Sequence, residues 1–150
     1  MSVPCAVGRG GLTKRKREGD GATPVGAWLL REIFYRADRV RAPVSSLKCS
    51  VIEQYDGWCD DPESPLYNKP VRLPFRYSHE KMWRDDHIYD IVVTLGYNDR
   101  PVVRNAGSAI FFHLAHDDFQ PTEGCVAVSL QDMRKILPLC GPGTIMEIGS

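Results

Sequence analysis

A histidine and a cysteine are the side chains in this sequence best placed to do chemistry together. Both lie in the stretch from Gly107 to Val128, where His113 closes an apolar run and Cys125 follows a glycine after a short polar loop. A thiol attacks as its thiolate, which needs a nearby base or positive charge at neutral pH. Each residue alone is more often part of a hydrophobic core, so the prediction depends on the pair. The glycine strengthens it, because a sharp turn there presents consecutive N–H groups to a carbonyl oxygen under attack.

Buried strands are expected to hold this stretch in place. Residues 89–97 and 108–114 are apolar on both alternating faces, which is typical of strands inside a sheet, and His113 stands near the end of the second one. Residues 27–35 are rich in aromatic and branched side chains and favour a further strand. A closing strand is expected over residues 144–148.

Two short helices complete the expected fold. Ser129 precedes a helix over residues 130–137 in a capping-box pattern. Ser78 is expected to cap a second helix of one or two turns over residues 80–86. The many short strands and two short helices predict a mainly β domain that spans residues 1–150.

A long segment between these elements is expected to form a lid over the site. Residues 55–76 contain four prolines, clustered acids and aromatic side chains without a sustained period. Long irregular stretches inside a compact domain are usually functional or disordered, and large aromatic side chains argue against disorder. We therefore expect an ordered lid inserted at about residues 55–89.

Charge and composition exclude several classes of protein. The 19 basic and 19 acidic residues cancel, so net charge favours neither nucleic acid nor an anionic membrane as a partner. The basic run at residues 14–17 matches a nucleic-acid or nuclear-import patch, but its position between glycine clusters is more typical of a solvated loop. No apolar run approaches the roughly 20 residues of a membrane-spanning helix.

The cysteines do not predict a disulfide framework. The five of them are an odd number and show neither a CxxC nor a zinc-finger spacing, so at least one thiol is free or pairs between chains. Their positions are Cys5, Cys49, Cys59, Cys125 and Cys140.

Three motifs together resemble the L,D-transpeptidase catalytic-domain family. They are Thr23-Pro-Val-Gly26 leading into an apolar strand, the histidine at the end of a late strand, and Thr122-x-Gly-Cys125 followed by a hydrophobic residue. The resemblance runs from about Cys5 to Ile148 and implies a β-sandwich fold.

The resemblance also implies an activity and a set of roles. The family's cysteine attacks a carbonyl of a peptidoglycan stem peptide, and an amine of a second stem then accepts the acyl group. Carried over by position, Cys125 is the nucleophile, His113 is the base, and the backbone N–H groups of Gly124 and Cys125 form the oxyanion hole. No metal or organic cofactor is implied, and the product is a cross-link between two diaminopimelates or between L-Ala and diaminopimelate.

The implied substrate places the protein in the periplasm or cell envelope. The N-terminal residues lack the charged start and long apolar stretch of a secretory signal peptide. We therefore expect either that a leader has been removed or that the protein acts in the cytoplasm, where it is made.

Three departures from the family pattern affect substrate binding. Glu123 replaces the usual histidine before the glycine, Ala127 replaces an arginine or asparagine, and the loop between His113 and Thr122 is shorter. Glu123 is expected either to favour a cationic amine or to bond a neighbouring backbone group. Because a carboxylate raises the pKa of a nearby thiol, we expect His113 to set the thiol's reactivity.

Other side chains are candidates for the walls of the substrate site. An arginine is needed if a substrate carboxylate is bound, although a surface ion pair is the alternative for each candidate. Core packing is the alternative for the two tryptophans. The arginine candidates are Arg9, Arg84 and Arg104, and the others are Thr122, Trp58, Asp60, Asp61, Tyr67, Asn68 and Trp83.

Three other functions compete with transpeptidation. With water as acceptor, the same thiol would make the protein an amidase or carboxypeptidase. The basic run and exposed aromatics would suit a module that binds polyanions or glycans, in a salt-sensitive way that survives Cys125→Ser. A metal site from His113, His116, Cys125 and Cys140 matches no standard zinc spacing.

Overall fold

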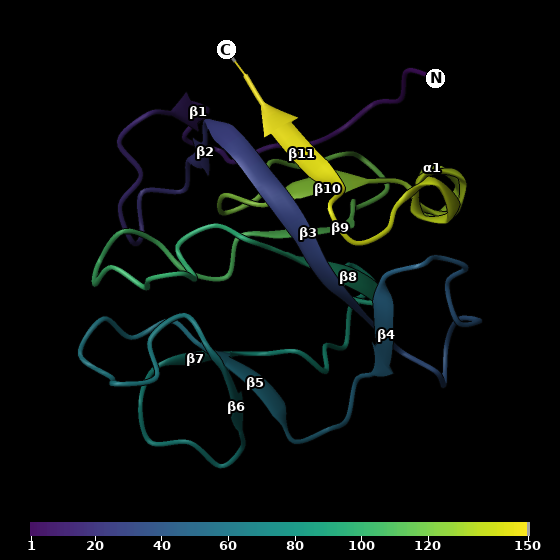
Figure 1. Ribbon diagram of the computed structural model, residues 1–150. Helices are drawn as coiled ribbons and strands as arrows, with labels where there is room; N and C mark the ends of the chain where they lie inside the picture. The colour runs from purple at the N-terminus through teal and green to yellow at the C-terminus, as the bar shows by residue number, and fades with distance from the viewer. Residues whose placement is uncertain (150) are drawn as a thin grey trace.

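The computed structural model describes residues 1–149, and its longest strand organises the main sheet. This strand, β3 (Gly26–Tyr35), pairs with β11 (Ile145–Ile148) near its start, and with β4 (Lys48–Val51) and β8 (Ile91–Leu95) nearer its end. Figure 1 shows β3 crossing the molecule diagonally between these partners. The strands predicted over residues 27–35 and 144–148 are thereby confirmed.

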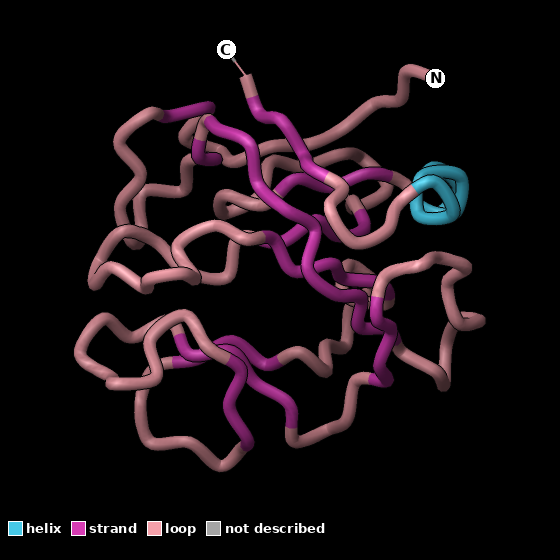
Figure 2. The backbone as a smooth tube through the Cα atoms, viewed as in Figure 1, coloured by secondary structure: helices cyan, strands magenta, loops and turns pink. Residues whose placement is uncertain are grey.

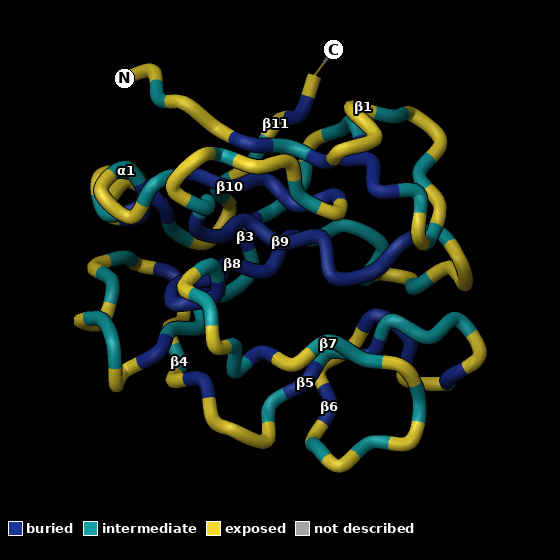
Figure 3. The backbone as a smooth tube through the Cα atoms, turned by 180° about the vertical axis from the view of Figure 1, so that it is seen from behind, coloured by how far each residue is buried: buried dark blue, intermediate teal, exposed yellow. Residues whose placement is uncertain are grey.

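The centre of the main sheet is formed by strands that are buried along their whole length. Strand β8 lies between β3 and β9 (Phe111–Leu114), and β10 (Val126–Val128) adds to β9 in parallel. Every residue of β8, β9 and β10 is buried, as the continuous dark trace in Figure 3 shows. Continuous apolar runs suit such strands because both faces of the sheet are covered. This confirms the buried strands predicted over 89–97 and 108–114.

The two faces of this sheet pack into different hydrophobic clusters. Val93 and Phe112 belong to the larger cluster, which includes the helix. Their neighbours Val92 and Phe111 belong to the second cluster, which contains Cys125. Successive side chains of a strand point to opposite faces, so this alternation follows directly from strand geometry. It places the cysteine on the face opposite the helix.

Residues 1–149 contain one α-helix, which is the solitary cyan coil of Figure 2. This helix, α1 (Leu130–Ile136), begins after Ser129, whose hydroxyl accepts the N–H of Asp132 at 3.1 Å. A 3₁₀ turn, η1 (Leu137–Leu139), follows it directly. The predicted N-terminal cap of this helix is confirmed.

The second predicted helix is wrong, because the chain after Ser78 forms a strand. Strand β7 (His79–Lys81) pairs with β5 (Asp56–Cys59), which pairs on its other side with β6 (Pro70–Arg72). The Ser78 hydroxyl donates to Asp60 Oδ1 at 2.6 Å instead of capping a helix. One or two helical turns are costly to nucleate, so pairing with β5 prevails over the local capping pattern.

The segment at residues 55–89, which we call the lid, is therefore ordered by its own three-stranded sheet. Figure 1 shows β5, β6 and β7 grouped together on one side of the main sheet. The lid packs on the core through Trp58, whose ring meets Phe111 edge-to-face at a centroid distance of 5.0 Å.

The N-terminal part of the chain lies along the edge of the main sheet. Strands β1 (Leu12–Thr13) and β2 (Thr23–Pro24) form a small parallel sheet of their own. Ala6 bridges Ala127 in β10, which brings the N-terminal segment next to the strand that follows Cys125. None of the helices described in residues 1–149 has the length and apolarity required to cross a bilayer.

Candidate active site

Cys125 lies immediately before β10 and is almost completely buried. Its thiol donates to the Ala109 carbonyl at 3.2 Å, and its sulfur accepts the Phe111 N–H at 3.3 Å. Gly124 before it has φ +135°, and a Cβ there would stand 2.9 Å from the Ala22 carbonyl oxygen. The turn that presents the cysteine therefore requires glycine, as the sequence indicated.

The environment of Cys125 favours the neutral thiol. Burial raises the pKa of Cys125 to about 12, and the Glu80 carboxylate adds to this effect. The Phe111 N–H and the cations of Lys16 and Arg84 act in the opposite direction but do not compensate. Without substrate the sulfur is a thiol, and a base must take its proton before or during attack.

His113 is held by its backbone neighbour in a form that leaves one ring nitrogen free. Its Nδ1 lies 2.8 Å from the carbonyl oxygen of Leu114. A carbonyl can only accept, so Nδ1 carries the hydrogen and Nε2 carries the lone pair. Burial lowers the pKa of His113 to about 4, and the ring of Tyr89 packs against it edge-to-face at 5.2 Å. Neutral imidazole is therefore the resting form.

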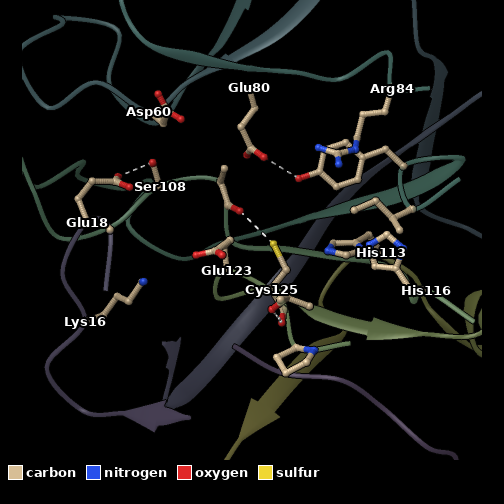
Figure 4. Close-up of a pocket in the computed structure, with 16 residues that line it drawn as sticks. Lys16, Glu18, Asp60, Glu80, Arg84, Ser108, His113, His116, Glu123 and Cys125 are labelled. Atoms are coloured by element: carbon tan, nitrogen blue, oxygen red, sulfur yellow. Dashed lines mark hydrogen bonds between the residues drawn. The ribbon is translucent and has the colours of Figure 1, made fainter. Parts of the chain in front are cut away.

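Cys125 and His113 line the same cavity, of about 430 Å³, between the main sheet and the lid. No hydrogen bond joins the two side chains within residues 1–149. Figure 4 shows residues of the lid on one side of this cavity and the Cys125 loop on the other. The lining residues are Lys16, Glu18, Gly19, Asp60, Glu80, Arg84, Ile88, Tyr89, Ser108, Ala109, His113, His116, Pro121, Thr122, Glu123 and Cys125.

These observations agree with a comparison of the chain with known protein families. The YkuD family, described as the L,D-transpeptidase catalytic domain, matches residues 1–148. The chain belongs to this family. The comparisons with curated proteins and with solved structures gave no match. The sequence resemblance predicts the family's cysteine at Cys125, which lines the cavity described above.

Glu80 is a residue of this cavity that the sequence analysis missed. Its position was interpreted as the first turn of a helix, whereas strand β7 places it in the cavity wall that faces Cys125 (Figure 4). Its Oε1 accepts the hydroxyl of Tyr89 at 3.0 Å. Burial raises the pKa of Glu80 to about 7, although the Tyr89 hydrogen bond opposes the shift. Only the pairing of β7 with β5 reveals this placement.

The basic run at residues 14–17 also contributes to the site, contrary to its interpretation as a wholly solvated loop. The Lys16 side chain is only 5% exposed, forms an ion pair with Asp20, and passes close to Gly107 and Gly124. Asp20 accepts the backbone N–H of Ala22 at 2.9 Å, which holds the loop in this turn. One of the four basic side chains therefore faces the cavity.

Glu18, two residues further on, joins the lid to the core. Its Oε1 accepts the hydroxyl of Tyr67 at 2.7 Å and that of Ser108 at 2.5 Å. The Tyr67 hydroxyl in turn accepts the Gly107 N–H at 3.0 Å. Tyr67, which we expected to form part of the substrate wall, is thus a buried contact that holds the lid in place.

Four of the predicted substrate-binding residues do line the cavity. Asp60 and Arg84 come from the lid, and Thr122 and Glu123 come from the loop before Cys125. Arg84 is paired with Asp86 at 2.7 Å. The Glu123 side chain is 77% exposed, and both of its oxygens accept the Nε–H of Arg9, so the two side chains form a surface ion pair at the mouth of the cavity.

The remaining predicted residues lie outside the cavity lining. Asn68 is buried, and its Oδ1 accepts the Nε1–H of Trp58 at 2.9 Å, so these two side chains bond to each other within the lid. Trp83 lies under the guanidinium of Arg36 at 3.5 Å, and Arg104 is exposed. These positions correct the expectation that Trp58, Asn68, Trp83 and Arg104 form walls of the pocket around Cys125.

The cysteines and histidines form no cluster of metal ligands within residues 1–149. Cys140 belongs to the hydrophobic cluster on the opposite face of the sheet, and its thiol donates to the Ile136 carbonyl at 3.3 Å. It is therefore separated from Cys125 and His113 by the main sheet. All five cysteines are free thiols.

Proposed function

We propose that this domain is a cysteine transpeptidase that acts on peptidoglycan stem peptides. The observation that carries the proposal is the pairing, in one cavity, of a buried thiol with an imidazole whose Nε2 is free. The family to which the chain belongs supports the same chemistry. A peptidoglycan substrate would place the protein in the cell envelope.

In the first half-reaction, Cys125 attacks the carbonyl that follows the third residue of a donor stem. The thiol leaves the Ala109 carbonyl and passes its proton to His113 Nε2 as the sulfur–carbon bond forms. The peptide C–N bond then breaks, and the departing amine takes that proton from His113. The product is a thioester on Cys125.

The oxyanion formed during attack needs a donor close to the nucleophile. The Gly124 N–H already donates to Thr122 Oγ1 at 3.1 Å. The Cys125 N–H has no protein acceptor in the described part of the chain, so we assign it the main role. Gly124 adds a second donor if its bond to Thr122 opens when substrate binds.

In the second half-reaction, an amine of another stem attacks the thioester and releases the thiol. Either a diaminopimelate-to-diaminopimelate or an L-Ala-to-diaminopimelate bond would result from this step. Water in place of the amine would give hydrolysis, the amidase or carboxypeptidase alternative.

Mass spectrometry of the products separates these outcomes. The protein is incubated with disaccharide-tetrapeptide, alongside Cys125→Ala and a matched control, Cys49→Ala, which removes an exposed thiol. Cross-linked dimers from the wild type and Cys49→Ala, but not from Cys125→Ala, are the expected result, and fragmentation identifies the bond. Trimmed monomers alone would indicate hydrolysis, and unchanged substrate would contradict the proposal.

A further inference from the structure

Glu80 is the residue of the cavity whose position the first half-reaction does not explain. It lies on the lid strand β7, opposite Trp58 of β5 in the sheet register, and lines the cavity wall across from Cys125. Figure 4 shows its carboxylate directed into the space between the lid and the nucleophile. It is close enough to Cys125 to raise the pKa of the thiol, which works against formation of the thiolate. Glu80 therefore does not activate the Cys125 thiol.

The other charges of the cavity make this wall selective for a cation. Lys16 and Arg84 each have an acidic partner, Asp20 and Asp86. Within residues 1–149, by contrast, the three carboxylates of Glu18, Asp60 and Glu80 take part in no ion pair. Their side-chain oxygens accept hydrogen bonds from hydroxyl groups: those of Tyr67 and Ser108 for Glu18, that of Ser78 for Asp60, and that of Tyr89 for Glu80. The cavity thus holds a surplus of negative charge that an ammonium group would compensate.

We propose that Glu80 is the proton acceptor for the incoming amine. This inference rests on the proposed transpeptidation and concerns only its second half-reaction. The Glu80 carboxylate takes one proton from the acceptor's ammonium group, and the neutral amine then attacks the carbonyl carbon of the Cys125 thioester. As the amide C–N bond forms and the C–S bond breaks, the second proton moves to the departing sulfur and restores the thiol. Glu80 returns its proton to water.

The surroundings of Glu80 suit a group that both binds and releases a proton near neutrality. Tyr89 OH holds Oε1, so Oε2 is the oxygen left for the ammonium group. Of the charged groups around it, Asp60 and Glu18 favour its protonated form and Arg84 favours the carboxylate. Burial is the largest influence and raises its pKa to about 7. A base with a pKa near the working pH is the most effective in proton transfer.

The test compares two nucleophiles on the same acyl-enzyme of Glu80→Gln. The protein is first acylated with disaccharide-tetrapeptide, and loss of the Cys125 adduct is followed by intact mass spectrometry after addition of either a stem-peptide amine or hydroxylamine. At pH 7 the stem amine is mostly protonated, because α-amino groups have pKa values of about 8, whereas hydroxylamine is mostly neutral. We expect acylation to be as fast as in the wild type or faster, because Glu80→Gln removes a carboxylate that raises the pKa of the Cys125 thiol. Reaction with hydroxylamine should stay within about twofold of wild type, and reaction with the stem amine should fall about 100-fold.

The pH profile supplies a second readout that a purely structural role would not move. Wild-type aminolysis should show an inflection near pH 7, and Glu80→Gln should lose it. Tyr89→Phe removes the hydrogen bond that stabilises the carboxylate, so the inflection should move to higher pH. Glu63→Gln is the matched control, because it makes the same change on an exposed lid residue.

Two results would overturn the assignment. One is unchanged aminolysis by the stem amine in Glu80→Gln; the other is an equal loss in acylation and with both nucleophiles, which would indicate a structural role. Absence of any Cys125 adduct in the wild type would instead refute the proposed function, and this inference with it.

Discussion

Replacing Asn68 with alanine tests whether this residue holds the lid to the core rather than binding substrate. Its side-chain oxygen accepts Trp58 Nε1 at 2.9 Å and the Ala109 N–H at 3.0 Å, and its amide donates to the carbonyls of Tyr97 and Asn98. Alanine leaves two buried donors without an acceptor, at a cost of about 1–3 kcal/mol each. Its backbone has φ +56°, where alanine costs about 1 kcal/mol more than asparagine.

The expected loss in the free energy of unfolding is therefore about 3–7 kcal/mol, which corresponds to a fall in Tm on the order of 10 °C or more for a domain of this size. Urea and thermal unfolding, followed by tryptophan fluorescence, measure both quantities. Asn105→Ala is the matched control, since Asn105 is exposed and also has positive φ, so it reports the backbone cost alone. A loss for Asn68→Ala within about 1 kcal/mol of that control would refute the assigned hydrogen bonds.

Three further predictions concern the site. Iodoacetamide at pH 7 should modify the two exposed thiols far faster than Cys125, because the pKa of Cys125 is about 12; similar rates in peptide mapping would contradict this. The pKa of His113 is lowered from 6.5 to about 4 in the folded protein, so between these values its contribution to the free energy of unfolding rises with pH. The pKa of Glu80 is raised from 4.5 to about 7, so between these values its contribution falls with pH. Each variant removes one of these two groups and leaves the other. Between pH 5 and 6.5 the free energy of unfolding in urea should therefore rise with pH for Glu80→Gln and fall with pH for His113→Asn; slopes of the same sign would contradict these pKa shifts. Gly124→Ala should lower stability by about 1–3 kcal/mol and abolish acylation, whereas a fully active variant would show that its φ of +135° is not required.

The local patterns of the sequence were sufficient to predict the central strands and the N-terminal cap of the helix. The apolar runs around β8 and β9 have no alternative to burial, and Ser129 caps its helix through a bond to a residue only three positions away. Such features depend on neighbouring residues, so they can be predicted without knowing the rest of the fold. The Gly124-Cys125 pair belongs to this class only in part: the φ of +135° at Gly124 is a property of the turn, whereas the close approach of the Ala22 carbonyl arises from the tertiary fold.

The lid shows where local patterns fail. Ser78 precedes a plausible helical turn, yet the segment pairs with β5, a strand that lies some distance earlier in the chain. The same pairing turns Glu80 into the cavity, and similarly Lys16 is drawn inward by Asp20 and by the space that Gly107 and Gly124 leave. A side chain's direction in a strand depends on the register with its partner, and a shift of one residue would reverse it.

The sequence by itself thus determined the family, the L,D-transpeptidase catalytic domain, and the strands that must be buried, and it singled out a cysteine, a histidine and a glycine turn as the groups of the proposed chemistry. Only the tertiary structure decided what surrounds that chemistry. It showed that two residues predicted as substrate walls have different positions: Asn68 forms hydrogen bonds between the lid and the core, and Asp60 lines the cavity. It also placed Glu80 opposite the thiol, because burial and charge at a site arise from segments that meet only after folding.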